Sequence, residues 1–183
     1  MIRILDFLAA IFGLILLSPI ILIITAILFA EHRKPFFTQK RLGKDQKLFT
    51  LIKFRSMSPK AANLPTHEIS VDLITKTGKF IRATKLDELP QLWNVLKGEM
   101  SLVGPRPCLP TQEELISERA SRGVFSLRPG ITGPAQVQNI DMSTPKKLAI
   151  EDSKMIANFK VSDYFKYVLM TVSGSGQGDK VRN

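Results

Sequence analysis

The apolar N-terminus constrains the fold of this chain more than any other segment. From Ile4 to Ala30 only Asp6 carries a charge. As one helix this stretch would be roughly 40 Å long, against about 30 Å for the hydrocarbon core of a bilayer. It is too long for the core of a signal peptide, and no small-residue cleavage pattern follows it. A membrane helix is therefore expected, with one tilted transmembrane span as the default.

Two features favour a helix that leaves the membrane on the side from which it entered. Pro19 removes a backbone donor and predicts a kink, and the hydroxyl of Ser18 can cover a freed carbonyl. The two halves are each too short to cross a bilayer alone. Basic residues flank both ends, with Arg3 before the stretch and His32-Arg33-Lys34 after it, as fits two cytoplasmic ends. From the residues alone, a spanning, a re-entrant and a buried helix all stay open.

The amino-acid composition limits the kinds of ligand and partner that the protein can be expected to bind. The 183 residues make one domain of ordinary size, and the net charge of +10 favours nucleic acid, acidic lipid headgroups or phosphorylated substrates. Aromatic residues interleaved with basic ones are too sparse to predict binding of single-stranded nucleic acid. A lone Cys108 excludes an internal disulfide and is interpreted as packing, while His32 and His67 have no metal-ligand spacing.

The remaining pattern predicts an α+β fold that is mostly helical. Two apolar runs, 36–41 and 47–55, bracket a turn at 43–46 and predict a β-hairpin packed against another element. Helices are expected over 71–83 (interrupted or ended near Gly78), 87–97, 110–122, 146–158 and 163–172. Loops are expected over 58–70 and 128–134. We divide the chain into a membrane anchor (1–34), a catalytic domain (35–172) and a flexible tail (173–183).

The helix expected over 87–97 has the clearest pattern. Its apolar stripe consists of Leu89, Leu92, Trp93 and Leu96, which we interpret as core or membrane-facing. Asp87 is a good N-cap, Pro90 lies in the permissive first turn, and Gly98 supplies a stop.

The acidic pair Asp87-Glu88 is the main chemical candidate. Capping alone would explain Asp87, but a helix N-terminus also keeps a carboxylate ionised and attracts phosphate. An ionised carboxylate can act as a nucleophile and divide one difficult displacement into two easier ones. Glu88 would then orient the site or handle a proton.

Cations near prolines and glycines are candidates for binding phosphate. Arg82, Arg106 and Arg128 each lie in or beside such a turn, and a guanidinium grips phosphate with two parallel bonds. Lys53 and Arg55 add two cations at the end of the hairpin. For any single arginine, a solvated or salt-bridged role is the simpler interpretation.

Six blocks together make the chain similar to a known family. They are Phe37-Thr-Gln39 with Arg41 and Gly43, 53–57, 78–82, 86–98, 100–107 and 128–133. On these blocks the chain resembles the monotopic phosphoglycosyl transferases, a bacterial sugar transferase family, from Ser18-Pro19 to Val172. It looks like a minimal catalytic form of that family.

The resemblance implies a fold, an activity and a location. It implies a re-entrant helix broken at Ser18-Pro19 and interfacial amphipathic helices around a surface active site, on the cytoplasmic face of the bacterial inner membrane. It implies transfer of a phosphosugar from a UDP-sugar to a polyprenol phosphate, usually undecaprenyl phosphate. This is the first membrane step of glycoconjugate or polysaccharide biosynthesis. Membrane lipid is then a partner, nucleic acid is not, and a homodimer is allowed.

The resemblance also implies roles for individual residues. Asp87 matches the nucleophile, which forms a covalent phosphosugar intermediate, and Glu88 completes the dyad. Magnesium is held near Asp87 and the diphosphate, Arg106 contacts phosphate, and Arg82 supports the dyad. Two segments depart from the family pattern, Gln138-Asn-Ile140 and Glu151-Asp-Ser-Lys-Met-Ile156, so the sugar donor stays open.

Two other functions compete with this hypothesis. A membrane-anchored basic module would bind anionic lipid or nucleic acid in a salt-sensitive way, without turnover. A membrane phosphohydrolase would use the same aspartate with water as the acceptor.

Overall fold

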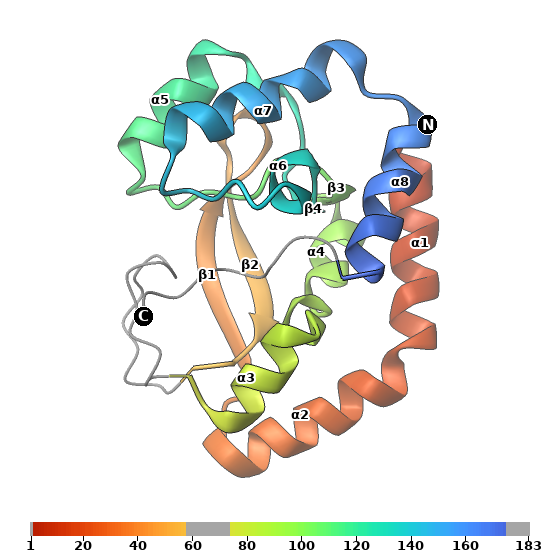
Figure 1. Ribbon diagram of the computed structural model, residues 1–183. Helices are drawn as coiled ribbons and strands as arrows, with labels where there is room; N and C mark the ends of the chain where they lie inside the picture. Colours follow the sequence, from red (N-terminus) through yellow and green to blue (C-terminus); the bar gives the residue numbers. More distant parts are fainter. Residues whose placement is uncertain (1, 58–73, 175–183) are drawn as a thin grey trace.

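The computed structural model describes residues 2–57 and 74–174, and its fold is α+β and mostly helical, as predicted (Figure 1). The helices are α1 (Ile2–Leu16), α2 (Ser18–His32), α3 (Lys76–Ala83), α4 (Gln91–Lys97), α5 (Glu113–Ser121), α6 (Pro134–Val137), α7 (Pro145–Asn158) and α8 (Val161–Val172). The strands are β1 (Phe36–Leu42), β2 (Leu48–Phe54), β3 (Ser101–Val103) and β4 (Gly130–Thr132). Three short 3₁₀ turns are η1 (Lys44–Gln46), η4 (Leu86–Glu88) and η5 (Val124–Ser126).

The predicted hairpin is confirmed and stands at the centre of the molecule (Figure 1). β1 and β2 pair antiparallel across the η1 turn, and the alternation in β2 buries Phe49 and Leu51. The element packed against it is α4. The buried side chain of Asn94 accepts from the amide of Ile52 (3.1 Å) and donates to the carbonyl of Thr50 (2.8 Å). Asn94 thus satisfies backbone groups at the free edge of β2 as a neighbouring strand would.

The N-terminal apolar stretch is broken where the sequence predicts. α1 and α2 meet at an angle of 62°, and the Ser18 hydroxyl donates to the carbonyl of Ile15 (2.8 Å). Among the described residues no single helix has the length and composition to cross a membrane, whereas the bent pair α1–α2 does when taken together. Apolar side chains point outward along both halves, including Phe7, Phe12 and Ile23.

The one acidic residue of α1 joins this helix to the rest of the molecule. Asp6 is buried and accepts three bonds of 2.9 Å each, from the hydroxyl of Ser101, the amide of Leu102 and the hydroxyl of Tyr164. Burial, with a smaller contribution from Asp6, raises the pKa of Tyr164, so this hydroxyl remains a donor. The contacts hold α1 against β3 and α8, and Figure 1 shows α8 beside α1.

The region of 128–134, expected to be a loop, contains a strand instead. β4 pairs in parallel with β3, and α6 follows directly. Where the two segments meet, Gly104 and Gly130 approach so closely that a β-carbon on Gly130 would lie 2.0 Å from the amide nitrogen of Gly104. The close backbone contact therefore requires glycine at this position. In the sequence alone, the same glycine is a signal for a loop.

Other boundaries differ modestly from expectation. α3 begins at Lys76, capped by Thr75, and continues through Gly78, where a β-carbon would collide with the carbonyl of Ser56. α5 begins at Glu113, later than expected, while α7 and α8 agree with prediction within two residues. The loop expected over 58–70, the start of the helix expected from 71 and most of the tail lie outside the described residues.

Candidate active site

The acidic pair lies in a tight turn that precedes α4. Asp87 and Glu88 belong to η4, whose bonds run from the amide of Glu88 to the carbonyl of Lys85 (3.2 Å) and from Leu89 to Leu86 (3.2 Å). Lys85 begins this turn with a left-handed backbone, φ 57°. The Asp87 residue is only 7% exposed. The turn therefore holds two adjacent carboxylates at a bend of the chain.

Asp87 is not the N-cap of the helix, contrary to the prediction. α4 begins at Gln91, with Pro90 at the cap position and no side chain capping it. Pro90 has no amide hydrogen, and the bonds around it have the i→i+3 spacing of a 3₁₀ turn. The buried face of α4 also differs from the predicted apolar stripe, because Leu92 and Val95 are buried while Trp93 is 51% exposed. Of the two interpretations of Trp93, core or membrane-facing, this exposure agrees with the second.

Arg106 faces the acidic turn from another part of the chain. Its Nη2 atom lies 3.4 Å from Oε1 of Glu88, and both side chains are partly exposed. Arg106 follows β3, on the segment Gly104-Pro-Arg-Pro107. The tertiary structure thus brings together one predicted arginine and the predicted carboxylates.

Two further cations flank the turn. Burial lowers the pKa of Lys85, and the nearby Arg106 lowers it further while Glu88 opposes the change. Arg82, in the last turn of α3, accepts a bond from Lys85 through its carbonyl (3.1 Å) and directs Nη1 to the hydroxyl of Ser56 (3.5 Å). Sequence reasoning missed Lys85, although it stands two residues before Asp87. These cations favour an anionic ligand beside the carboxylates.

Arg128, predicted to bind phosphate, lies at the other end of α4. Its Nε atom donates to the carbonyl of Gly98 (3.0 Å), just past the last residue of the helix. Since α4 separates this contact from Asp87 by about 10 Å of helix, Arg128 does not converge on the acidic turn.

Lys53 and Arg55 meet at an aromatic ring. The Lys53 Nζ and the Arg55 guanidinium lie 5.7 and 5.8 Å from the centre of the Phe37 ring. Arg55 also donates to the carbonyls of Lys34 (2.9 Å) and Phe36 (3.1 Å), which fixes the start of β1. β2, which contains Lys53 and ends directly before Arg55, contacts the η4 turn that contains the carboxylates.

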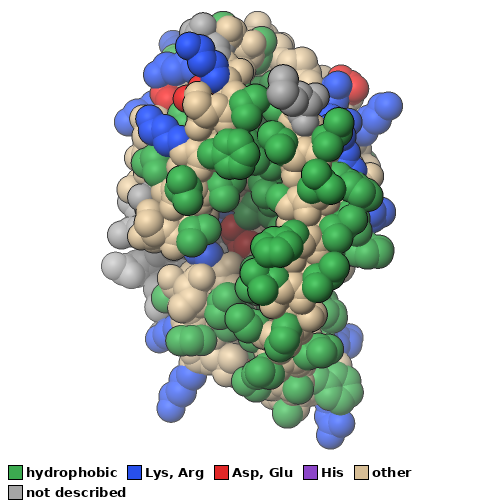
Figure 2. Space-filling view, turned by 90° about the vertical axis from the view of Figure 1, so that its right-hand side faces the viewer, with side chains coloured by type: hydrophobic (Ala, Val, Ile, Leu, Met, Phe, Trp, Pro, Cys, Tyr) green, Lys and Arg blue, Asp and Glu red, His purple; other side chains and the backbone are tan. Residues whose placement is uncertain are grey.

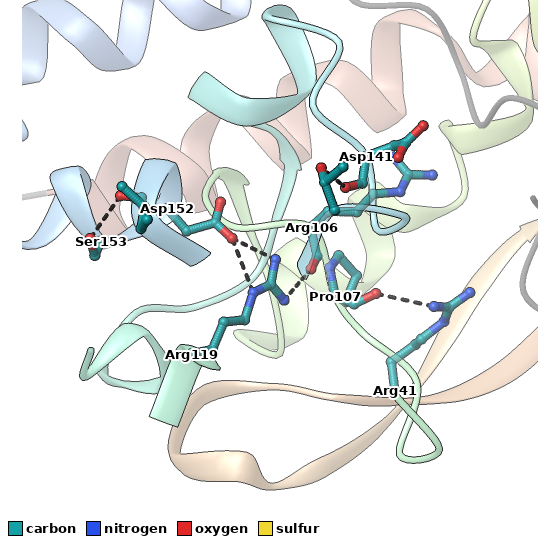
Figure 3. A network of polar contacts seen from close by, with 9 residues as sticks. Arg41, Arg106, Pro107, Arg119, Asp141, Asp152 and Ser153 are labelled. Carbon is teal, nitrogen blue, oxygen red and sulfur yellow. Dashed lines mark hydrogen bonds and ion pairs between the residues drawn. The ribbon is translucent and has the colours of Figure 1, made fainter. Parts of the chain in front are cut away.

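Behind Arg106 lies a buried ion pair that local sequence reasoning did not find. Nε and Nη2 of Arg119, on α5, donate to Oδ2 of Asp152, on α7, at 3.0 and 2.6 Å. Figure 3 shows this pair, with the third nitrogen of Arg119 directed at the Arg106 backbone. The two residues are 33 positions apart, and no local motif links them.

The carboxylates of the acidic turn fit a magnesium ion whose coordination is completed by the substrate. In the part of the chain that the structure describes, no group of three or more His, Cys, Asp or Glu side chains is placed to hold a metal. Magnesium in phosphate-transfer sites is commonly held by one or two carboxylates together with phosphate oxygens. Asp87 and Glu88 match that pattern, in which the substrate completes the coordination.

The thiol of Cys108 is buried beside the site segment. Burial raises its pKa, although Arg119 opposes the change. The residue belongs to a core cluster with Leu115, Ala135 and Leu148. These facts agree with the interpretation of Cys108 as a packing residue.

The comparisons with known proteins agree with one another on the family that the chain resembles. The model of the bacterial sugar transferase family matches residues 1–177. The chain is 44% identical over 154 residues to the uncharacterized sugar transferase EpsL of Bacillus subtilis, covering 81% of this chain and 74% of EpsL. It is 33% identical over 188 residues to the exopolysaccharide production protein ExoY of Rhizobium meliloti, covering 91% of this chain and 81% of ExoY.

A longer relative has a more specific name. The UDP-glucose:undecaprenyl-phosphate glucose-1-phosphate transferase of Klebsiella pneumoniae is 43% identical over 134 residues, which cover 68% of this chain. The match spans only 28% of that enzyme. Other relatives are likewise matched over a minority of their length, 41% or less.

Proposed function

The chain belongs to the bacterial sugar transferase family, and from that premise we propose that it transfers a sugar 1-phosphate from a UDP-sugar to undecaprenyl phosphate, in bacterial polysaccharide or glycoconjugate biosynthesis. The name of the Klebsiella pneumoniae relative describes a reaction of this class. The observation that carries the proposal is the pair Asp87-Glu88 in one tight turn, with Nη2 of Arg106 lying 3.4 Å from Oε1 of Glu88.

The proposed reaction has two displacements. In the first, a carboxylate oxygen of Asp87 attacks the phosphorus that bears the sugar, and the bond from this phosphorus to the bridging oxygen breaks, so that UMP leaves. The sugar phosphate is then attached to Asp87 as an acyl phosphate. In the second, a phosphate oxygen of undecaprenyl phosphate attacks the same phosphorus, which frees Asp87 and yields the lipid diphosphate sugar.

The cations lower the barrier to this attack. A carboxylate approaching a diphosphate meets like charge, and the guanidinium of Arg106 offsets it. Arg106 also holds Glu88, which keeps the second carboxylate beside the first. Magnesium, held by Asp87 and Glu88 together with the donor diphosphate, would neutralise further charge when bound. Lys85 and Arg82 add positive charge on the preceding turn.

The N-terminal pair α1–α2 is proposed to be a re-entrant anchor on the cytoplasmic face of the membrane. The two ends of the pair attach to the same body of the protein. At the start of α1, Arg3 donates to the carbonyls of Val95 and Leu96, and in α2 the buried Leu28 packs with Phe54. A helix pair with both ends on one body supports a return to the same side. Figure 2, which looks onto the face with α1 and α8, shows apolar side chains gathered along it, with lysine and arginine near its margins.

A product assay tests the proposed function. The full chain in detergent or nanodiscs is given a panel of UDP-sugars with magnesium, with and without undecaprenyl phosphate, and release of UMP and lipid product are measured. The proposal expects a lipid diphosphate sugar only when the acceptor is present, and an adduct of one sugar phosphate on Asp87 by mass spectrometry when it is absent.

Each competing function predicts a different result in the same assay. A phosphohydrolase would release free sugar phosphate continuously without the lipid acceptor. A basic binding module would show salt-sensitive lipid binding and no UMP.

The re-entrant anchor is tested separately, by the accessibility of an N-terminal tag in intact cells. A tag that is accessible from the outer side would contradict a re-entrant anchor.

A further inference from the structure

The segment that presents Arg106 is held from behind by a buried arginine, and we propose that this residue, Arg119, is a positioning residue for phosphate transfer. Arg119 fixes the backbone of Arg106, and this directs the Arg106 guanidinium toward Glu88 and the donor diphosphate. The inference deepens the proposed function and rests on it.

The backbone of this segment is held at successive residues by different elements. Four carbonyls in a row each accept a bond: Pro105 from the amide of Gly130 (2.9 Å), Arg106 from Nη1 of Arg119 (2.8 Å), Pro107 from Nη1 of Arg41 (3.2 Å) and Cys108 from the amide of Leu42 (3.0 Å). Prolines on both sides of Arg106 restrict its backbone further. The carbonyl of Arg106 itself is held by a side chain, and that side chain is Arg119 (Figure 3).

Arg119 is suited to this task by its burial and its bonding. Its side chain is 2% exposed, and that of Asp152 is 0% exposed. Two nitrogens of the guanidinium bond to one oxygen of Asp152, which leaves the third to donate to Arg106. Because the guanidinium is planar and rigid, anchoring two nitrogens sets the direction of the third.

A buried ion pair needs a reason beyond stability. Removing two charges from water costs about as much as their attraction returns, and apolar replacements of similar volume are often neutral. Packing of α5 on α7 therefore does not require the Arg119–Asp152 pair. What apolar side chains cannot supply is a directed donor to the carbonyl of Arg106.

The end of the same helix provides a matched control. Arg122, the C-cap residue directly after α5, forms an ion pair with Glu118 and donates to the Glu118 carbonyl (2.8 Å). This pair is partly exposed, and Arg122 contacts Glu118 and Ser121, both near the end of the helix. Arg122 thus has the same chemistry without the contact to the Arg106 segment.

The experiment compares Arg119→Lys with Arg122→Lys in the full chain. Lysine keeps the charge opposite Asp152 but cannot place two nitrogens on the carboxylate and a third on the carbonyl. We expect Arg119→Lys to lower kcat/KM for UMP release about tenfold, the effect of one hydrogen bond from a charged group. Arg122→Lys should remain within about twofold of the parent chain.

A double-mutant cycle separates positioning from general stability. If Arg119 acts through Arg106, Arg119→Lys should change kcat/KM less than about twofold in an Arg106→Ala background. Unchanged turnover in Arg119→Lys, or a full additional loss in the Arg106→Ala background, would overturn the proposal.

Binding of UDP with magnesium, measured by calorimetry, gives a readout that does not need turnover. We expect about tenfold weaker binding in Arg119→Lys, and the same in the double variant Arg119→Met with Asp152→Leu, which leaves no buried charge unpaired. A folded double variant that binds UDP as the parent does would overturn the proposal. If the parent binds UDP but makes no lipid product, the proposed function fails while this comparison still decides the role of Arg119.

Discussion

The two ends of α4 use arginine in opposite ways. Before the helix, Arg106 faces the carboxylate of Glu88, and both side chains are partly exposed. At the C-terminal end of the helix, Arg3 and Arg128 donate to backbone carbonyls, Arg3 to Val95 (2.5 Å) and Leu96 (2.7 Å) and Arg128 to Gly98 (3.0 Å). Cations at a helix C-terminus satisfy its free carbonyls and match its dipole. Arg106 and Arg128 both lie in segments of proline and glycine, so their different partners are set by the tertiary structure and not by their sequence context.

The largest effect should come from the acidic end. We expect Asp87→Asn to lower turnover by at least about 10³-fold, because an amide cannot act as the nucleophile. UMP release and the covalent adduct measure it, and thermal unfolding should show a folded protein. The control is Asp45→Asn, at an exposed position with φ 54° that asparagine tolerates. Full activity in Asp87→Asn would remove this residue from the proposed role.

The second prediction contrasts the arginines at the two ends. Arg106→Ala should reduce kcat/KM about 10²-fold, since it removes charge stabilisation at the phosphate. Arg128→Ala should retain activity within about threefold at temperatures where it is folded, because it loses one bond to a carbonyl. Steady-state kinetics on the two variants, side by side, measures the contrast. An equal loss in both would show that Arg128 also serves the site and would break the comparison.

The third prediction concerns stability at the carbonyl end. Arg3→Met removes two bonds to the last turn of α4 and should lower the free energy of unfolding by about 2 kcal/mol. Thermal unfolding in one detergent gives the difference from the parent chain. As a control, Lys97→Met removes an exposed ion pair with Glu99 and should cost less than about 0.5 kcal/mol. Equal stability of the two variants would contradict a structural role for Arg3.

The smallest effect tests the turn that ends α4. Gly98 has φ 82°, so Gly98→Ala should cost about 1 kcal/mol through backbone strain. Its β-carbon would also lie 3.1 Å from Nη2 of Arg3, whereas at Gly123, with φ 70°, the nearest atom would be 3.9 Å away. Gly98→Ala should therefore lower the melting temperature slightly more than Gly123→Ala. Equal melting temperatures would mean that Arg3 moves aside at no cost, and the reverse order would contradict the prediction.

Local sequence patterns predicted the elements that depend on local contacts. The hairpin followed from alternation around a glycine-containing turn, and the break at Pro19 followed from its missing amide hydrogen. Patterns failed at one local boundary and at one contact between distant segments. The sequence pattern predicts too early a start for α4, because the 3₁₀ turn before Pro90 has the composition of a helix start. It predicts a loop at β4, because the partner strand of β4 lies elsewhere in the chain.

The sequence by itself determined a broken apolar N-terminal stretch, an acidic pair and a surplus of cations. Only the tertiary structure decided which cation meets the acidic pair, because α4 places Arg106 and Arg128 at opposite ends. It also decided that Arg119 and Asp152, 33 residues apart, lie buried behind the site. The physical reason is that backbone conformation follows largely from neighbours along the chain, whereas the partner of a charged side chain is set by which segments pack together in space.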